Sequence, residues 1–238
     1  QVHVRVDIAS CLHLPQHVES RFDIAALLQQ QVVQQPPQPG IIAQLRKALD
    51  DHPGLAHVTQ ELSDEEILKR LGIEEASPEG LFFPDTYHFA SGSSDLRTLR
   101  RAHRLMQSNL DTQWSQRAPG LPIATPYEAL ILASIVEKET GRDEERPLVA
   151  AVLVNRLRKG MLLQVDPTVI YGLGESFDGN LRKRDLLKDA PYNTYTRVGL
   201  PPTPIAMPGL ASLVAALNPP ASDVLYFVSR GDGTSHFS

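Results

Sequence analysis

One stretch of the chain combines a long apolar run with polar residues that are typical of helix ends. Almost every residue of 130–136 is apolar, and Thr125, Pro126 and Glu128 precede this run. Thr125 and Glu128 have the spacing of a capping box, and proline is favoured at the first helical position. The pattern therefore predicts a helix that begins after Thr125 and ends just before Gly141.

Helical spacing of apolar residues recurs elsewhere, again with capping signals. Ser63 and Glu66 form a second capping-box pattern, and Gly72 and Gly160 each follow an apolar stretch as terminators. Ser94 is a further candidate cap. Helices are therefore predicted over 41–72, 94–110, 147–159 and 208–218, with a short one through residue 170 after a turn at 166–167.

Strand signals are fewer and shorter. Valine alternates with polar residues in 2–6, and short apolar runs occupy 162–165 and 224–228. Each pattern predicts a strand, and the last is expected to pair with a strand starting at residue 236, after a turn at 231–233. Helices with a few short antiparallel strands indicate the α+β class, with a mainly helical catalytic domain.

Two segments interrupt this regular pattern. Residues 28–40 are rich in glutamine and proline, which predicts an irregular loop. Residues 190–208 are rich in proline and are expected to be extended.

Composition narrows the possible partners. The 238 residues are 42% hydrophobic and 21% charged, with a formal net charge of -5, the balance of a soluble globular protein. Basic residues gather at 97–104 and 182–184 without interleaved aromatics, so a solvated helix face explains them better than a polyanion site. The negative net charge argues against nucleic acid as a binding partner. The single cysteine, Cys11, excludes an intrachain disulfide.

Two glutamates lie near the end of the helix that precedes Gly141. Glu137 and Glu139 are two positions apart, so they point to different faces and cannot share one proton as a dyad. The negative end of a helix dipole disfavours an anion in the last turn, which predicts a raised pKa for Glu139. A general acid needs such a pKa, although a solvated pair of glutamates would show the same pattern.

Polar residues suited to sugar hydroxyl and acetamido groups follow in two segments. A simpler interpretation is that some of them, Asp166 and Asn193 among them, merely form turns. The candidate substrate-binding residues in these segments are Gln164, Asp166, Thr168, Tyr171, Asn193, Thr194 and Tyr195.

Other chemistries lack their motifs. Gly172 and Gly174 stand without the third glycine of a dinucleotide loop, and no Gly-Lys-Ser or Gly-Lys-Thr phosphate loop is present. No histidine or cysteine cluster has zinc-ligand spacing. We therefore expect no metal and no organic cofactor.

Several motifs together resemble the endolytic murein transglycosylases, the MltG/YceG-like family. The resemblance extends from about residue 41 to the chain end. The motifs are Glu79-Gly-Leu-Phe-Phe-Pro-Asp-Thr-Tyr, Ala133-Ser-Ile-Val-Glu-Lys-Glu-Thr, Val154-Asn-Arg-Leu, Leu163-Gln-Val-Asp-Pro-Thr-Val-Ile-Tyr-Gly, Tyr192-Asn-Thr-Tyr and Gly199-Leu-Pro-Pro-Thr-Pro-Ile.

The resemblance implies an enzyme that cuts peptidoglycan between N-acetylmuramic acid and N-acetylglucosamine without water, leaving 1,6-anhydro ends. The family's catalytic glutamate lies in Glu-Lys-Glu-Thr and matches Glu139, with Glu137 as the runner-up. Tyr87 is a candidate for stacking on a sugar face. A hydrolytic muramidase, with Asp166 as second acid, and a non-catalytic glycan-binding module remain as alternatives.

The resemblance also implies an organisation. We expect an N-terminal region with a helical subdomain at 1–78, in which 8–40 depart from the family pattern, and a catalytic core at 79–238 that is cut short at its C-terminus. Family members are held to the bacterial inner membrane by an N-terminal helix, absent here, with the catalytic domain facing the periplasm or outer side. Glycan strands, and glycan-polymerising synthases, are the implied partners.

Overall fold

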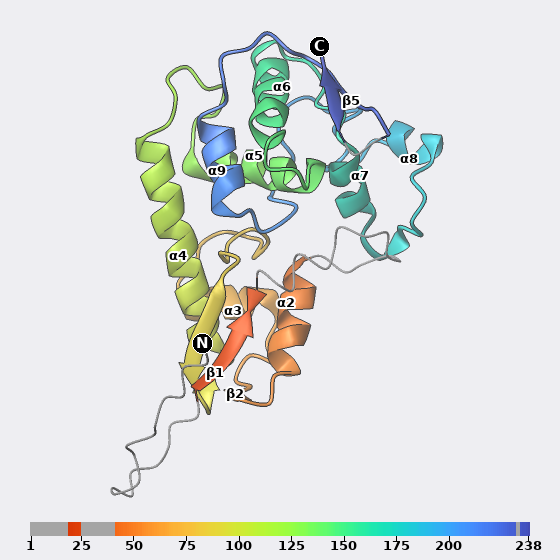
Figure 1. Cartoon of the computed structure of the whole chain (residues 1–238). Helices are drawn as coiled ribbons and strands as arrows, with labels where there is room; N and C mark the ends of the chain where they lie inside the picture. The colour runs from red at the N-terminus through yellow and green to blue at the C-terminus, as the bar shows by residue number, and fades with distance from the viewer. Residues whose placement is uncertain (1–18, 25–40, 232–233) are drawn as a thin grey trace, which may run out of the picture.

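The computed structural model describes residues 19–24, 41–231 and 234–238, and the described chain forms two lobes that share one long helix (Figure 1). This helix, α4 (Asp95–Ser115), runs along both lobes. Its start is capped by Ser94, whose hydroxyl accepts a hydrogen bond from the Arg97 N–H at 3.3 Å. The helix predicted at 94–110 is confirmed, and it continues for five residues beyond the expected end.

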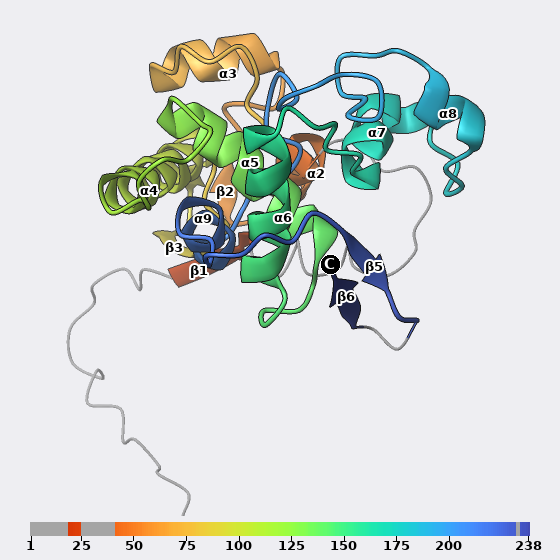
Figure 2. The same cartoon turned by 90° about the horizontal axis from the view of Figure 1, so that it is seen from above.

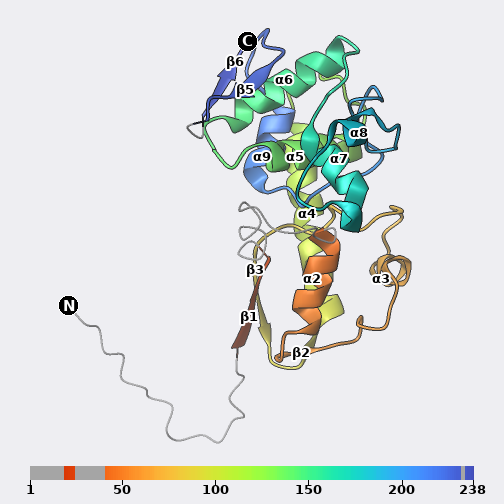
Figure 3. The ribbon, with the colours of Figure 1, turned by 90° about the vertical axis from the view of Figure 1, so that its right-hand side faces the viewer.

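The N-terminal lobe is built on a small sheet flanked by helices. Strand β1 (Glu19–Asp23) pairs antiparallel with β3 (Thr86–Ala90), so that Asp23 lies opposite Thr86. Between them in sequence come α2 (Ile41–Asp50) and α3 (Asp64–Leu71). Figure 3 shows α2 beside this pair of strands and α3 farther from it.

A second pair of strands, each two residues long, lies at the end of this lobe. Strands β2 (Leu55–Ala56) and β4 (Ser93–Ser94) pair in parallel. The sequence predicts antiparallel strands, so this pair is an exception to the expectation.

The C-terminal lobe is helical around α5 (Pro126–Glu139). Helices α6 (Arg146–Arg158) and α9 (Leu210–Leu217) pack against it, and α7 (Asp166–Leu173) contacts its C-terminal part. A one-turn 3-10 helix (Gly174–Ser176) and α8 (Lys183–Leu187) follow α7. Strands β5 (Phe227–Ser229) and β6 (Ser235–Phe237) form an antiparallel pair at the edge of the lobe (Figure 2).

The sequence of α5 explains its central position. Its residues 129–136 are all buried, and a helix that is apolar on every side must be surrounded by protein. The predicted capping box is present, because Thr125 accepts from the Glu128 N–H and the Glu128 carboxylate accepts from the Thr125 N–H. This cap contributes about 1 kcal/mol to stability.

The single helix predicted for 41–72 is wrong. The chain forms α2, then the β2 strand at Leu55, and then α3 with its predicted Ser63 and Glu66 capping box and its Gly72 terminator. Pro53 and Gly54 break the helical run, because proline lacks an N–H and glycine favours turns. Apolar spacing alone did not show this interruption.

The strand predicted at 162–165 is also wrong. Leu163 and Val165 are buried, but the N–H of Gln164 donates to the backbone oxygen of Thr194 at 3.0 Å and the N–H of Val165 to its hydroxyl at 3.1 Å. Tertiary bonds to a loop replace those of a sheet. Turns replace the expected extended conformation within 191–196.

The remaining expectations agree with the structure in type and differ at their ends. Helices α6 and α9 match the predicted ranges, α7 runs to Leu173, and the strand expected at 224–228 is confined to β5. The β6 strand is confirmed. The strand expected at 2–6, the loop at 28–40 and residues 232–233 of the turn lie outside the described residues.

Candidate active site

Glu139 is the last residue of α5 and lies where that helix meets α7. The backbone leaves the helix at Thr140, which is extended. Burial, and after it the negative charge of Asp166, raise the pKa of Glu139 to about 7, although the positive charge of Arg156 opposes both effects. Among the described residues, none donates a hydrogen bond to this carboxyl group. Glu139 is therefore a partly exposed carboxyl with the pKa of a general acid.

Glu137 has different surroundings on the same helix turn. Its Oε2 accepts hydrogen bonds from the Gly209 N–H at 3.0 Å and from the Ser212 hydroxyl at 2.7 Å. Its Oε1 lies 3.9 Å from the guanidinium of Arg146. Glu137 thus ties the start of α9 to α5, and its acceptor atoms are already engaged.

Asp166 begins α7 and is exposed. Its Oδ1 accepts a hydrogen bond from the Tyr195 hydroxyl at 2.5 Å. Burial, this hydrogen bond and the negative charges of Asp166 and Glu139 raise the pKa of Tyr195, so the phenol remains a donor. Glu139, Asp166 and Tyr195 therefore form one polar cluster assembled from a helix end, a helix start and a loop.

Gln164 lies two residues before Asp166 and is exposed. Its φ is 53°, in the left-handed region that residues other than glycine rarely adopt. Such strain persists only where surrounding contacts impose it, and it is frequent at functional sites. The backbone bonds of 164 and 165 to Thr194 impose it here.

Thr168 and Thr194 are brought together but not exposed. Both are buried, their hydroxyls lie 2.8 Å apart, and the Thr168 hydroxyl also donates to the Val165 backbone oxygen at 2.8 Å. These bonds fasten the loop containing Thr194 to the start of α7. The two threonines therefore hold the loop and the helix that carry the site, but they do not reach the protein surface.

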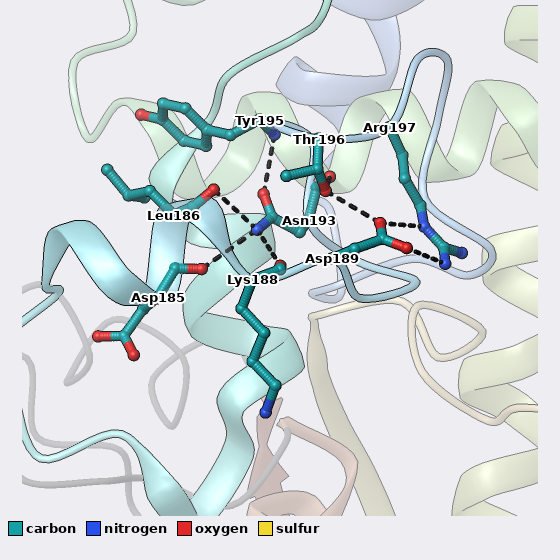
Figure 4. Close-up of polar contacts among 8 residues, drawn as sticks. All are labelled: Asp185, Leu186, Lys188, Asp189, Asn193, Tyr195, Thr196 and Arg197. Carbon is teal, nitrogen blue, oxygen red and sulfur yellow. Dashed lines mark hydrogen bonds and ion pairs between the residues drawn. The ribbon is translucent and has the colours of Figure 1, made fainter.

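Asn193 is also buried and fully bonded (Figure 4). Its Nδ2 lies 3.1, 3.1 and 2.7 Å from the backbone oxygens of Asp185, Leu186 and Lys188, and its Oδ1 accepts from the Tyr195 N–H at 2.9 Å. The side chain closes the C-terminal end of α8 onto the loop that carries Tyr195.

The two remaining tyrosine candidates lie apart from Glu139 and Asp166. Tyr171, on α7, is partly buried and meets Tyr192 edge-on with ring centroids 4.9 Å apart. Tyr87, on β3, is buried in the core of the N-terminal lobe, and its hydroxyl donates to the Phe83 backbone oxygen at 2.8 Å. The structure therefore does not bring Tyr87 into the cluster around Glu139.

Sequence reasoning did not single out Arg156. This buried side chain donates to the backbone oxygens of Leu163 and Leu225, both at 2.7 Å, and its guanidinium lies 5.0 Å from the ring centroid of Tyr226. It fastens the segment before Asp166 to α6 and provides the positive charge near Glu139. An arginine within the apolar helix predicted at 147–159 was the available signal.

One group of potential metal ligands lies in the N-terminal lobe. Oxygen and nitrogen atoms of Asp50, His57 and Asp95 lie within 4.8 Å of one another. The buried Asp95 carboxylate, however, already accepts from the N–H groups of Val58 and Thr59 and from the Thr59 hydroxyl. These bonds assign Asp95 to holding the loop before α3.

Two curated proteins are similar in sequence to about two thirds of this chain. The chain is 38% identical over 160 residues to the endolytic murein transglycosylase of Bacillus subtilis, covering 67% of this chain and 44% of that protein. It is 34% identical over 156 residues to the protein of that name from Streptococcus pneumoniae D39, covering 63% and 28%. The chain thus spans less than half the length of these relatives.

A solved structure and a family model complete the comparison. A yceG-like protein from Listeria monocytogenes aligns with a TM-score of 0.62 and 31% identity, over 82% of this chain and 64% of that one. Among the described residues, we find no helix long and apolar enough to cross a bilayer. The model of the YceG-like family matches residues 10–238, and the chain therefore belongs to the YceG-like family.

Proposed function

We propose that this protein cuts peptidoglycan glycan strands by lytic transglycosylation, with Glu139 as its acid and base. The observation that carries the proposal is the carboxyl group at the end of α5, whose pKa burial raises to about 7 and to which no described residue donates a hydrogen bond. Such a group holds a proton near neutral pH and is free to give it to a substrate. The names of the relatives supply the substrate class.

The proposed reaction uses one carboxyl group twice. Glu139 gives its proton to the oxygen between C1 of muramic acid and O4 of the next glucosamine, and the C1–O4 bond breaks. The Glu139 carboxylate then takes the proton from the C6 hydroxyl of the same muramic residue while O6 bonds to C1. The products are a free 4-hydroxyl and a 1,6-anhydro end, and Glu139 regains its proton.

Asp166 of the cluster, and Gln164 two residues before it, are exposed and would contact the sugars. Gln164 offers both a donor and an acceptor, and Asp166 retains Oδ2 beside the Tyr195 hydroxyl. Because Thr168, Asn193 and Thr194 are buried, we assign them a supporting role instead of contact.

The nearness of Asp166 to Glu139 favours a hydrolase as the second candidate. Most glycosidases use two carboxyl groups, one as acid and one as base or nucleophile. In that reaction water would attack C1 and leave a reducing end. The hydrogen bond from Tyr195 to Asp166 Oδ1 would orient this carboxylate for such a role.

The setting of the reaction is part of the proposal. We infer that the full-length protein works on the outer side of the bacterial inner membrane, anchored by a segment outside this chain. There it would end or trim new glycan strands made by glycan-polymerising synthases. Co-purification of the full-length protein with such a synthase would test this last step.

Mass spectrometry of digested glycan strands tests the chemistry. The chain, Glu139→Gln and Glu137→Gln would each be incubated with purified strands, and the new ends identified. We expect 1,6-anhydro ends from the chain and from Glu137→Gln, and none from Glu139→Gln. Reducing ends would favour the hydrolase, and cuts by Glu139→Gln would exclude Glu139 as the acid. Binding without cutting by the unmodified chain would point to a glycan-binding module.

A further inference from the structure

Helix α8 and the loop after it close around a single buried amide. The two N–H groups of the Asn193 side chain point to the end of α8, where Nδ2 lies 3.1, 3.1 and 2.7 Å from the backbone oxygens of Asp185, Leu186 and Lys188 (Figure 4). The last carbonyls of a helix lack partners within the helix, so this amide replaces the missing donors. Because α8 has only five residues, it can form few backbone hydrogen bonds within itself.

The other half of the same amide holds Tyr195. The Oδ1 of Asn193 accepts from the Tyr195 N–H at 2.9 Å, which fixes the backbone where the tyrosine side chain begins. The Tyr195 hydroxyl then donates to Asp166 Oδ1. A continuous line of hydrogen bonds thus runs from α8 through Asn193 and Tyr195 to the first residue of α7.

The side chain of Asn193 has no hydrogen-bonding atom available to a substrate. The side chain is 1% exposed, and both its donor and its acceptor atoms are engaged within the protein. A ligand could reach it only by displacing these bonds and leaving buried polar groups unsatisfied.

We propose that Asn193 is a positioning residue that, through Tyr195, holds the Asp166 carboxylate in place beside Glu139. The effect of Asn193 on the reaction rests on the proposed function. The hydrogen bonds from Asn193 through Tyr195 to Asp166 do not depend on that function. Partners one step removed from a reacting group commonly orient it in this way.

The consequence concerns the proton on Glu139. The groups that act on it are Asp166 of α7, Arg156 of α6 and Tyr195 of the loop. A fixed Asp166 repels the charged form of Glu139, whereas an exposed carboxylate freed from Tyr195 can turn into solvent, where screening weakens the repulsion. Release of Asp166 therefore lowers the pKa of Glu139. The Glu139 carboxyl then keeps its proton over a narrower range of pH.

Titration of the Glu139 carboxyl by carbon-13 NMR tests this without needing activity. The signal is assigned by its loss in Glu139→Gln and followed in Tyr195→Phe, Asn193→Ala and the double variant. We expect both single changes to move the pKa from about 7 toward the ordinary value of 4.5. The double variant should show no shift beyond that of Tyr195→Phe, because Asn193 acts on Asp166 only through Tyr195.

Asp189→Asn is the matched control. It lies in the same loop and removes the exposed ion pair with Arg197, with N–O distances of 2.8 and 2.9 Å, but leaves Asn193 and Tyr195 bonded. We expect no shift of the Glu139 pKa in this variant. If Asn193→Ala does not fold, Asn193→Leu, which fills the same buried space but offers no acceptor to the Tyr195 N–H, replaces it.

The outcomes separate the two proposals. An unchanged Glu139 pKa in the Asn193 variant, or shifts that add in the double variant, would overturn the positioning role even if the chain makes anhydro ends. Linked shifts in a protein that cuts no glycan would support the positioning role and refute the proposed function. In an active protein, the high-pH limb of the cleavage rate should move to lower pH with the same variants.

Discussion

The two glutamates in the last turn of α5 face different parts of the C-terminal lobe. Glu137 faces the start of α9, where an N–H and a hydroxyl donate to it and Arg146 lies nearby. Glu139 faces α7, where burial and the charge of Asp166 act against its ionised form. Two glutamates on one helix turn thus differ in their surroundings. Glu137 is held by hydrogen-bond donors, whereas Glu139 lies near a negative charge.

The difference shows that the surroundings of a carboxyl group decide what it does. The donors around Glu137 engage its carboxyl oxygens and make it part of the framework that joins α5 to α9. The scarcity of donors around Glu139 costs stability and leaves a reactive proton. Substitution of Glu137 and of Glu139 should therefore have different effects on activity and on stability.

The largest difference is expected in catalysis. Loss of a general acid lowers rates by about 100- to 10,000-fold, so Glu139→Gln should lose activity on that scale. Glu137→Gln should retain activity within about tenfold, because the amide oxygen can still accept from Ser212. Initial rates of glycan cleavage at pH 6 measure both, with circular dichroism as the control for folding. Equal losses would remove the distinction.

The next effect is a pH-dependent gain in stability when Glu139 is neutralised. Its folded-state pKa of about 7 exceeds the ordinary 4.5, so its stabilising contribution is complete below 4.5 and is lost as pH rises through 7. This corresponds to at most about 3 kcal/mol. Glu139→Gln should therefore match the parent near pH 4.5 and exceed it in urea unfolding at pH 8. A difference that does not depend on pH would contradict the assignment.

Removal of the other glutamate should have the opposite sign. Glu137→Ala leaves the Gly209 N–H and the Ser212 hydroxyl without their acceptor, at a cost of about 1–3 kcal/mol. Urea unfolding at pH 7 measures the loss, and Ser212→Ala in the same background should cost less than it does alone. A Glu137→Ala protein as stable as the parent would refute the framework role.

The smallest effect is expected at the far end of the same helix. Thr125→Ala removes the hydroxyl that accepts from the Glu128 N–H, at a cost of about 1 kcal/mol. Because neither glutamate of the last turn is involved, the loss should be the same at pH 6 and at pH 8. A loss confined to one pH would show that the two ends of α5 are coupled.

Helix ends were the most predictable part of the fold. The capping boxes at Thr125 and Ser63 and the terminator Gly72 are local, since their bonds join residues within one turn. The misassigned segments depend on distant partners. Residues 162–165 are held by Thr194, and the position of that loop cannot be derived from local spacing.

In the candidate site, too, local features were predictable and features that depend on distant residues were not. The pattern at the end of α5 correctly distinguishes the faces of Glu137 and Glu139 and predicts the direction of the Glu139 pKa, although burial and not the helix end is its main cause. The polar segments around 164–171 and 193–195 do lie together. Burial of Asn193 could not be predicted, because it depends on three carbonyls of a helix that the sequence did not indicate.

The helix shared by the two lobes has a mechanical consequence. Its 21 residues span about 30 Å, with Leu99 and Ala102 in the core of the N-terminal lobe and Met106 and Leu110 in the core of the C-terminal lobe. A hinge between the lobes would have to bend this rod or pull one end out of a packed interior. The two lobes should therefore melt as a single cooperative unit, and a long polymer drawn across one lobe would transmit its tension to the other.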